Sequence, residues 1–177
     1  MGMMFLLPFT PLAAPGTYLT RFLALNNEHA VELSHASPSQ FSELVAAAKI
    51  AFGLADPVAF LLAYDETSPY CGANYLWFKS RYDRFVYVDR VVVEPRARGR
   101  GIAGAFYQEL FRRARTSGHE TICAEINIQP PNPGSDTFHA RLGFREVGRS
   151  DPLSSGKIVR YVTAPCNRVP KERELRV

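Results

Sequence analysis

The chain has 177 residues, 46% of them hydrophobic and 21% charged, which is typical of one globular domain with a proper core. Its formal net charge of +4 is too small for a dedicated nucleic-acid binder but suits an anionic cofactor. The three cysteines are widely spaced, with no C-x-x-C pair or Cys/His cluster. They support neither a disulfide framework nor a metal site, and a reducing cytoplasm fits best.

The first 17 residues are apolar but lack the features of a targeting signal. They have no basic segment, and Pro8 and Pro11 interrupt the short apolar stretch. No stretch of the chain approaches the roughly 18 apolar residues that span a bilayer. We therefore expect a flexible extension over 1–17, one folded domain over 18–164 and a frayed tail over 165–177, with no membrane partner.

Hydrophobic patterning in the amino-terminal half predicts strands and helices in alternation. Residues 18–25 read as a first strand and 28–34 as a short helix. Ser37-Pro38 begins a second helix, and 50–54 and 58–63 form a hairpin of two strands. A polar insert with several aromatic residues follows over 65–84.

The carboxy-terminal half continues with a β-branched strand over 87–93 and an amphipathic helix that ends near Gly118. The next predicted elements are a strand over 121–128, a loop, and a short helix capped by Ser135 and ended by Gly143. Strands over 144–147 and 158–163 close the sheet.

The segment ArgAlaArgGlyArgGly over residues 96–101 lies between the strand at 87–93 and the following helix. The first N–H groups of a helix lack internal partners and carry partial positive charge, and glycines let a phosphate approach them. This is not a P-loop, because no Lys-Ser or Lys-Thr follows the glycines, and Gly104 is misplaced for a dinucleotide fingerprint. We expect a pyrophosphate cradle; the alternative is an exposed Arg-rich turn.

The order strand, R-x-x-G-x-G, helix, strand, Asn-containing loop and then PheHisAlaArgLeuGlyPhe (138–144) resembles the GNAT superfamily of acyl-CoA-dependent N-acyltransferases. TyrValAspArgValValVal (87–93) and ProProAsnProGlySer (130–135) further resemble a bacterial group of predicted acetyltransferases. The resemblance implies an α/β (α+β) fold. It would be a GNAT-like single domain whose central mixed, mostly antiparallel sheet is splayed at the cofactor cleft and flanked by helices.

By the same resemblance the cofactor is acetyl-CoA. Its pantetheine arm would lie between the splayed strands, and its pyrophosphate on the backbone N–H groups that follow the glycines. The implied cofactor-binding residues are Val91, Val93, Arg98, Gly99, Arg100, Gly101, Ile102, Ala103, Gly104, Asn132 and Phe138.

Acetyl transfer to an amine needs a base for the amine, stabilisation of an oxyanion and a proton for the departing thiolate. Glu125 is the first candidate for the base, since a carboxylate in the middle of an apolar strand is unusual unless it is solvated or serves a site. A glutamate at the matching position is the base in several amino-terminal acetyltransferases. Asp89, expected on one strand face with Tyr87, Val91 and Val93, is the second candidate. A salt-bridged carboxylate is the alternative for both.

His139 stands where many members of the superfamily carry a tyrosine that acts as general acid toward the CoA thiolate. Histidine can donate a proton, and its reference pKa of ~6.5 lies below the ~8.5 of a thiol. His139 is therefore the candidate acid. A histidine that is simply hydrogen-bonded within the helix is the alternative.

The insert over 65–84 lies where related proteins form the acceptor pocket, and Asn127 shares a strand face with Glu125. The candidate acceptor-binding residues are Asn74, Tyr75, Trp77, Arg81 and Asn127. The alternative for the insert is an aromatic helix packed on the sheet.

The first functional hypothesis is a cytoplasmic N-acetyltransferase. It would move an acetyl group from acetyl-CoA to a primary amine of a small molecule or a peptide, by direct attack in a ternary complex. The second is a non-catalytic CoA-binding or regulatory module, favoured by the histidine at 139. A nucleic-acid partner is not expected. The resemblance also allows a homodimer.

Overall fold

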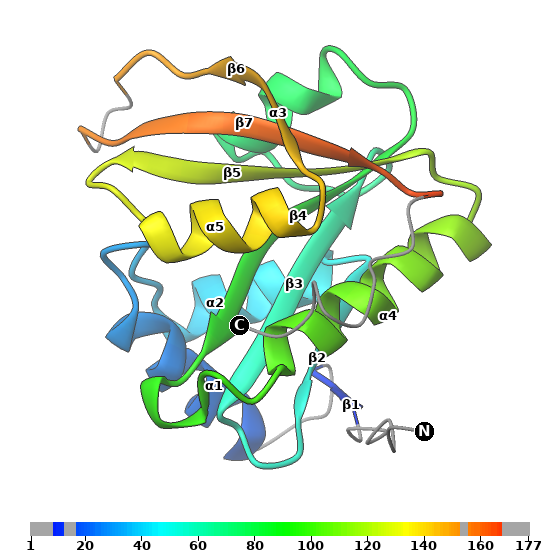
Figure 1. Ribbon diagram of the computed structural model, residues 1–177. Coiled ribbons are helices and arrows are strands. Elements are labelled where there is room, and N and C mark those ends of the chain that lie inside the picture. Colours follow the sequence, from blue (N-terminus) through cyan, green and yellow to red (C-terminus); the bar gives the residue numbers. More distant parts are fainter. Residues whose placement is uncertain (1–8, 13–16, 153–155, 168–177) are drawn as a thin grey trace.

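The computed structural model describes residues 9–12, 17–152 and 156–167 (Figure 1). Most of the extension and tail expected from the sequence lies outside these residues. Phe9–Pro11, however, forms strand β1 and pairs antiparallel with β2. The sheet thus begins within the segment that was expected to be a flexible extension.

The described residues build one seven-stranded sheet in the order β1-β2-β3-β4-β5-β7-β6. Its further strands are β2 Ile50–Leu54, β3 Ala59–Asp65, β4 Phe85–Val93, β5 Thr121–Gln129, β6 Arg145–Arg149 and β7 Ile158–Pro165. Only β4 and β5 are parallel; every other neighbouring pair is antiparallel. The mixed, mostly antiparallel sheet that the sequence predicts is confirmed.

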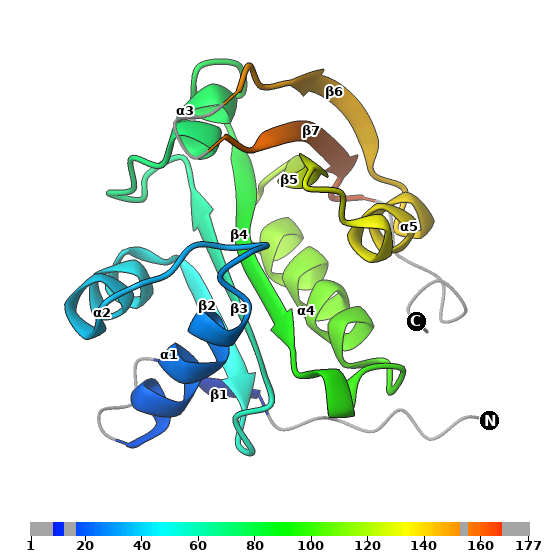
Figure 2. The ribbon, with the colours of Figure 1, turned by 90° about the vertical axis from the view of Figure 1, so that its left-hand side faces the viewer.

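Helices cover both faces of the sheet (Figure 2). Helices α1 Thr17–Glu28 and α2 Pro38–Ala47 lie on one face, and α4 Ile102–Thr116 and α5 Pro133–Arg141 on the other. The short helix α3 Ala73–Lys79 packs on the end of the sheet near β6 and β7. Three buried clusters result: one under α4 and α5, one under α1 and α2, and an aromatic one under α3.

The prediction of a strand over 18–25 is wrong, because this segment is helix α1. Phe22 and Leu25, one helical turn apart, are buried against β3 and α2. Apolar residues on both sides of the short segment hid the helical period. Residues 29–34, expected as a short helix, form turns that lead toward α2.

The starts of α2 and α5 show why these segments are helical. Ser37 accepts the N–H of Gln40 at 3.3 Å, and the Gln40 side chain accepts the N–H of Ser37 at 2.8 Å, which completes a capping box. At α5 the cap is Asn132, whose Oδ1 accepts the N–H of Ser135 at 3.1 Å. The prediction that Ser135 caps this helix is therefore wrong by three residues.

Strands β4 and β5 separate halfway along their length. They pair from Phe85–Val88 to Thr121–Ala124, and no pairs follow in the described residues. At the same level the β3–β4 register shifts, so that Asp89 is an extra residue between Val88 and Arg90. This β-bulge corrects the expected strand face: Val91 and Val93 pack toward the α4 cluster, whereas Asp89 contacts the hydroxyl of Tyr87.

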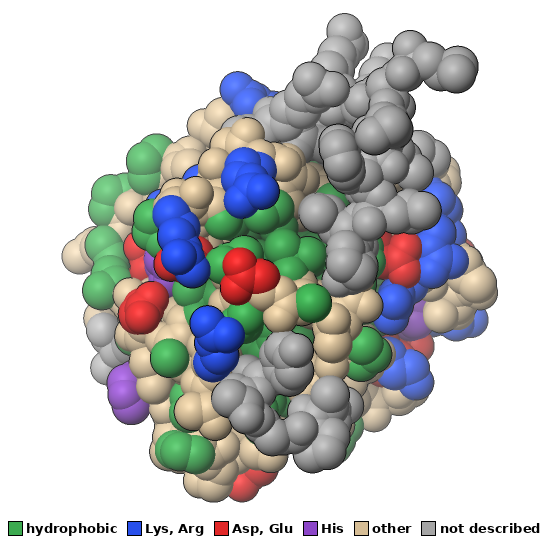
Figure 3. All heavy atoms as spheres, turned by 90° about the horizontal axis from the view of Figure 1, so that it is seen from below, with side chains coloured by type: hydrophobic (Ala, Val, Ile, Leu, Met, Phe, Trp, Pro, Cys, Tyr) green, Lys and Arg blue, Asp and Glu red, His purple; other side chains and the backbone are tan. Residues whose placement is uncertain are grey.

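The face seen from below carries Lys and Arg side chains interspersed with acidic and apolar ones (Figure 3). Arg112 and Arg113 of α4 both form ion pairs with Glu109, each with a guanidinium nitrogen 2.7 Å from its Oε1.

In the described residues no helix combines the length and apolar character that crossing a bilayer requires.

Candidate active site

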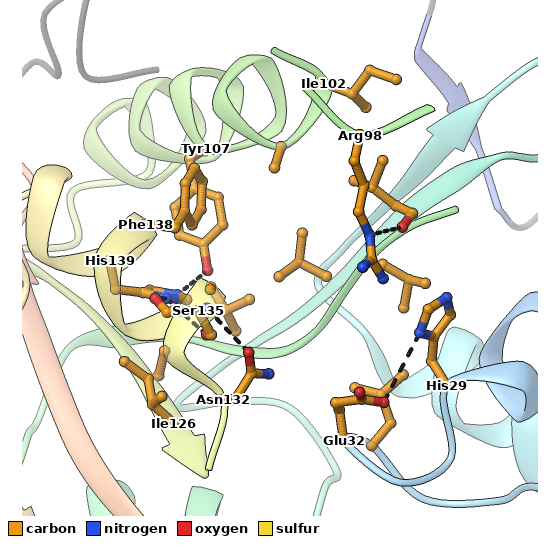
Figure 4. Close-up of a pocket in the computed structure, with 18 of the residues that line it drawn as sticks. His29, Glu32, Arg98, Ile102, Tyr107, Ile126, Asn132, Ser135, Phe138 and His139 are labelled. Atoms are coloured by element: carbon orange, nitrogen blue, oxygen red, sulfur yellow. Dashed lines mark hydrogen bonds and ion pairs between the residues drawn. The ribbon is translucent and has the colours of Figure 1, made fainter. Parts of the chain in front are cut away.

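A cavity of about 340 Å³ opens where β4 and β5 separate (Figure 4). Its walls come from the carboxyl ends of both strands, the first turns of α4 and α5, and the loop that follows α1. Because parallel strands end at the same edge, two helix N-termini face this space, and that of α4 offers backbone N–H groups that no side chain caps. The cavity therefore favours an anionic group at this end.

Ten of the eleven residues expected at the cofactor line this cavity: Val91, Val93, Arg98, Gly99, Gly101, Ile102, Ala103, Gly104, Asn132 and Phe138. The eleventh, Arg100, is exposed and is not part of the lining. The fold thus brings together nearly all of the residues that the resemblance assigns to the cofactor.

The glycine turn is a backbone feature rather than an arginine cluster. Gly99 and Gly101 have φ of 71° and 75°, a left-handed conformation that favours glycine. No side chain caps α4 at Gly101, so its first N–H groups are free to bind an anion. Arg98 fixes the turn to β4 through a 3.1 Å hydrogen bond from its Nε to the carbonyl of Val93.

Glu125 is the first residue of β5 beyond the last residue that pairs with β4. Burial raises the pKa of its carboxyl to about 8, and the negative charge of Asp89 acts in the same direction. Hydrogen bonds with Tyr87 and Asn74 oppose this rise in pKa. Its Oε2 is buried and has no hydrogen-bond partner in the described part of the chain. An unpartnered buried carboxyl oxygen beside a cavity is free to take a proton from a ligand.

Asp89 is fully engaged by neighbouring side chains. Its Oδ2 accepts the Nε–H of Arg90 at 2.9 Å, and its Oδ1 accepts the hydroxyl of Tyr70 at 2.8 Å. The Asp89 and Arg90 side chains are 8% and 7% exposed. The ion pair considered as the alternative for Asp89 is therefore present, and the carboxylate is less available than that of Glu125.

His139 lies in a closed hydrogen-bond arrangement between α4 and α5. Its Nδ1 is 2.8 Å from the carbonyl of Ser135, and its Nε2 is 2.7 Å from the hydroxyl of Tyr107. Burial lowers the pKa of the imidazole to about 4, so it is neutral at physiological pH. The hydrogen bond with Ser135 and the charge of Asp136 act in the opposite direction but do not outweigh burial.

Tyr107 and the loop residues His29 and Glu32 also line the cavity, and sequence reasoning missed all three. Tyr107 belongs to the apolar stripe of α4, where it reads as an ordinary core residue. Because the loop was expected to be helical, no sequence feature indicated that it lines the cavity.

Hydrogen bonds from side chains on β4, on β5 and just before β7 hold this loop beside the gap between β4 and β5. Asn127 of β5 donates its Nδ2–H to the carbonyl of Glu32 at 3.1 Å. Arg90 of β4 bonds the hydroxyl of Ser34 at 3.1 Å and the Oδ1 of Asn26. Lys157, just before β7, donates to the carbonyl of Leu33. The loop is therefore a fixed wall of the cavity.

Among the residues expected to bind the acceptor, only Asn127 lines the cavity. Tyr75 is completely buried, with its hydroxyl 2.8 Å from the carbonyl of Asp65. The Trp77 ring stacks on the Tyr161 ring with their centroids 4.1 Å apart. The guanidinium carbon of Arg81 lies 4.1 Å from the centroid of the Trp77 ring. Asn74 accepts the Tyr161 hydroxyl at 3.2 Å and reaches the cleft only through its hydrogen bond with Glu125. The helical part of the insert, α3, is thus an aromatic helix packed on the sheet.

Asp65, Glu66 and His119 form a second cluster of titratable groups, outside the cavity lining. The Nε2 of His119 is 3.2 Å from Glu66, while Lys49 lies 3.7 Å from Asp65 and Arg84 lies 4.0 Å from Glu66. These basic side chains balance the charge of the two carboxylates.

Comparison with known proteins places this architecture. A search of curated proteins finds no match. Among solved structures, the NatC complex bound to Gag peptide and CoA matches with a TM-score of 0.69 and 13% identity, over 89% of this chain and 96% of that one. Arabidopsis thaliana NAA60 in complex with acetyl-CoA matches with a TM-score of 0.68 and 15% identity, over 90% and 98%. The ribosomal-protein-S18-alanine N-acetyltransferase of Escherichia coli matches with a TM-score of 0.61 and 16% identity, over 93% and 96%.

These likenesses show a shared fold. The sequence profile described as the acetyltransferase (GNAT) family matches residues 22–144, which is more than half of the chain. The match spans the separated strands, the glycine turn and the segment around His139. The chain therefore belongs to the acetyltransferase (GNAT) family.

Proposed function

We propose that this protein binds acetyl-CoA in the cavity between β4 and β5 and transfers its acetyl group to a primary amine. The observation that carries the proposal is the juxtaposition of a free helix N-terminus at Gly101 with an unpartnered carboxyl oxygen on Glu125 in the walls of one cavity. The first suits the pyrophosphate of the cofactor, and the second suits the proton of an attacking amine.

The cofactor part rests on the glycine turn and the separated strands. The backbone N–H groups from Arg98 to Gly104 would hold the pyrophosphate. The edge of β4 that faces β5, which has no strand partner at Val91 and Val93 in the described residues, would bond the pantetheine arm. Asn132 and Phe138 would flank that arm from the start of α5. Two structures with the same fold contain CoA or acetyl-CoA, which supports this assignment.

The catalytic part rests on Glu125. With a pKa near 8 its carboxyl can take a proton from an α-amino group, whose reference pKa is ~7.7–8.0, more readily than from a lysine at ~10.4. Direct attack of the amine on the thioester then needs no acetylated enzyme intermediate. Asp89 would act on Glu125 through its charge, without contacting the acceptor.

The acceptor side is bounded by Glu32, His29 and Asn127. A small molecule or the amino terminus of a peptide would enter beside this wall. The comparison structures include proteins described with a peptide and with an alanine of a ribosomal protein, so peptide amino termini belong first on a test panel.

One observation favours the second candidate, a CoA-binding module without turnover. Both nitrogens of the His139 ring are hydrogen-bonded within the protein, so the single ring proton of the expected acid is already engaged. Acetyl-CoA-dependent thiol release across peptide amino termini, lysine peptides, amino acids, polyamines and aminoglycosides separates the two. Release with one class supports the transferase, whereas silence with demonstrated CoA binding supports the module.

A further inference from the structure

The contact between Tyr107 and His139 has a defined direction. The backbone carbonyl of Ser135 can only accept a hydrogen bond, so the Nδ1 of His139, 2.8 Å away, carries the ring proton. The Nε2 of the neutral ring is then an acceptor, and the Tyr107 hydroxyl donates to it at 2.7 Å. Tyr107 is 0% and His139 is 3% exposed.

Neither member of this pair has a proton available for a ligand. The single hydroxyl proton of Tyr107 lies in the bond to His139, and rotating it toward the cavity would leave a buried ring nitrogen without a partner. The Nδ1 proton of His139 faces the start of α5, where the carbonyl and the hydroxyl oxygen of Ser135 lie 2.8 and 3.2 Å from Nδ1. The low pKa of His139 excludes a second ring proton near neutral pH. The position at which related proteins hold a general acid is therefore chemically closed in this chain.

Glu125 differs from the pair because its Oε2 is buried in the cavity wall without a partner in the described residues. Titratable or charged groups face it from every neighbouring element. They are Tyr87 and Asp89 of β4, Tyr70 before α3, Tyr107 of α4, and Lys157 and Tyr161 at β7. Of these, only Asp89 and Tyr107 line the cavity, and both are already hydrogen-bonded to other groups.

We propose that Glu125 both accepts the amine proton and returns it to the sulfur, and that Tyr107 and His139 form a closed pair that joins α4 to α5. This inference rests on the proposed acetyltransferase function. The amine nitrogen forms the C–N bond to the thioester carbonyl carbon, and the C–S bond breaks with its electron pair on sulfur. One N–H proton passes to Glu125 and from there to the sulfur, which leaves an amide, a free thiol and the carboxylate in its starting state.

The energetics of this transfer favour a single carboxyl. A carboxyl with a pKa near 8 is closely matched to a thiol with a reference pKa of ~8.5, so the proton moves between them with little change in free energy. Burial raises the pKa of Tyr107 far above that of a thiol. Proton donation from Tyr107 to the sulfur would therefore run strongly uphill.

Two variants test the inference. Tyr107→Phe removes one oxygen without changing the shape of the side chain. Tyr107→Phe/His139→Met removes both hydrogen-bonding partners together, so that neither is left buried and unpaired. Turnover is measured from pH 7 to 9.5 at saturating acetyl-CoA and acceptor. It is expressed as the ratio to wild type at each pH, so that ionisation of the acceptor cancels. Thermal unfolding and the KM for acetyl-CoA establish that both variants are folded and bind the cofactor.

We expect both ratios to stay within about twofold of one across this range, whereas Glu125→Gln loses about a hundredfold or more. A folded variant of Tyr107 or His139 that loses tenfold in kcat with an unchanged KM for acetyl-CoA would overturn the inference and make the pair the acid. That result leaves the acetyltransferase function standing. If instead the wild-type protein binds CoA but releases no thiol with any amine, the proposed function fails, and the inference with it.

Discussion

Glu125 gains its chemical character from its place in the strand. It follows directly after the last residue of β5 that pairs with β4, so its carboxyl faces the space between the strands but remains shielded from water. Burial raises the pKa to about 8, and most of the carboxyl is protonated at neutral pH. Because a base must be deprotonated, we expect turnover to rise with pH through this value.

The same shift predicts how stability depends on pH. A carboxyl whose pKa is higher in the folded protein than in the unfolded chain binds protons more tightly when folded. Its contribution to stability is complete below the unfolded pKa of ~4.3 and is lost as the pH rises through about 8. Glu125→Gln should therefore unfold at nearly the same temperature as wild type near pH 3.5 and at a higher temperature at pH 9, where its free energy of unfolding exceeds that of wild type by about a few kcal/mol.

Thermal unfolding of both proteins at the two pH values checks this prediction. Glu109→Gln is the matched control, because Arg112 and Arg113 lower the pKa of Glu109 to about 2. The stabilising effect of that carboxylate is present above its unfolded pKa, so this variant should lose stability at pH 9, where Glu125→Gln gains it. An equal unfolding temperature for wild type and Glu125→Gln at pH 9 would contradict the burial of a charge at Glu125.

At the scale of elements, the glycine turn before α4 combines backbone strain with ligand approach. Gly99→Ala and Gly101→Ala place a Cβ on residues with φ of 71° and 75°, which costs roughly 1–2 kcal/mol in each case. The added methyl group also crowds the N–H groups that would hold the pyrophosphate. We expect the KM for acetyl-CoA to rise tenfold or more.

Gly156→Ala separates the two effects. Gly156 has the same left-handed conformation, with φ of 77°, but its Cβ would meet nothing within 4 Å. This control should lose a similar amount of stability and keep its affinity for CoA, as measured by calorimetry. Equal losses of affinity in all three variants would mean that strain alone, and not the cradle, governs cofactor binding.

The loop after α1 supplies a second prediction at this scale. Asn127→Ala removes the hydrogen bond that holds the carbonyl of Glu32, at a cost in stability of about 1 kcal/mol. Because Arg90 and Lys157 still hold the loop, we expect the fold to persist. The KM for the acceptor should rise severalfold, while the KM for acetyl-CoA stays constant. Steady-state kinetics with each substrate varied in turn measure both; an increase confined to acetyl-CoA would contradict an acceptor wall.

The elements that the sequence predicts well are those with strong local signals. The glycine turn, the strand at β4 and the start of α2 at Ser37 follow from turn chemistry, β-branched residues and the Ser37-Pro38 helix start. The prediction of a strand over 18–25 is wrong because the burial of Phe22 and Leu25 depends on their packing against β3, which the local pattern does not show. The bulge at Asp89 and the bond between Tyr107 and His139 depend on residues far apart in the chain, which local patterns do not carry.

At the scale of the whole molecule, the one parallel strand pair in the described part of the chain determines where the candidate site forms. A parallel pair needs a crossover, which here is α4, and this crossover begins at the carboxyl end of β4. The chain leaves β5 at the same edge and enters α5 there. The glycine turn, Glu125 and the loop after α1 therefore meet at one opening, although the residues that line it are spread from His29 to His139.

The central proposal is that this cavity supports acetyl transfer with Glu125 as the base. The deciding measurement is thiol release from acetyl-CoA by wild type and Glu125→Gln with the best amine acceptor, together with CoA affinity and mass analysis of the acceptor. We predict an acetylated acceptor, CoA affinity equal within about twofold, and turnover lower by about a hundredfold or more in the variant. Equal turnover in the two proteins would contradict the account, as would an acceptor left unmodified by a wild-type protein that binds CoA.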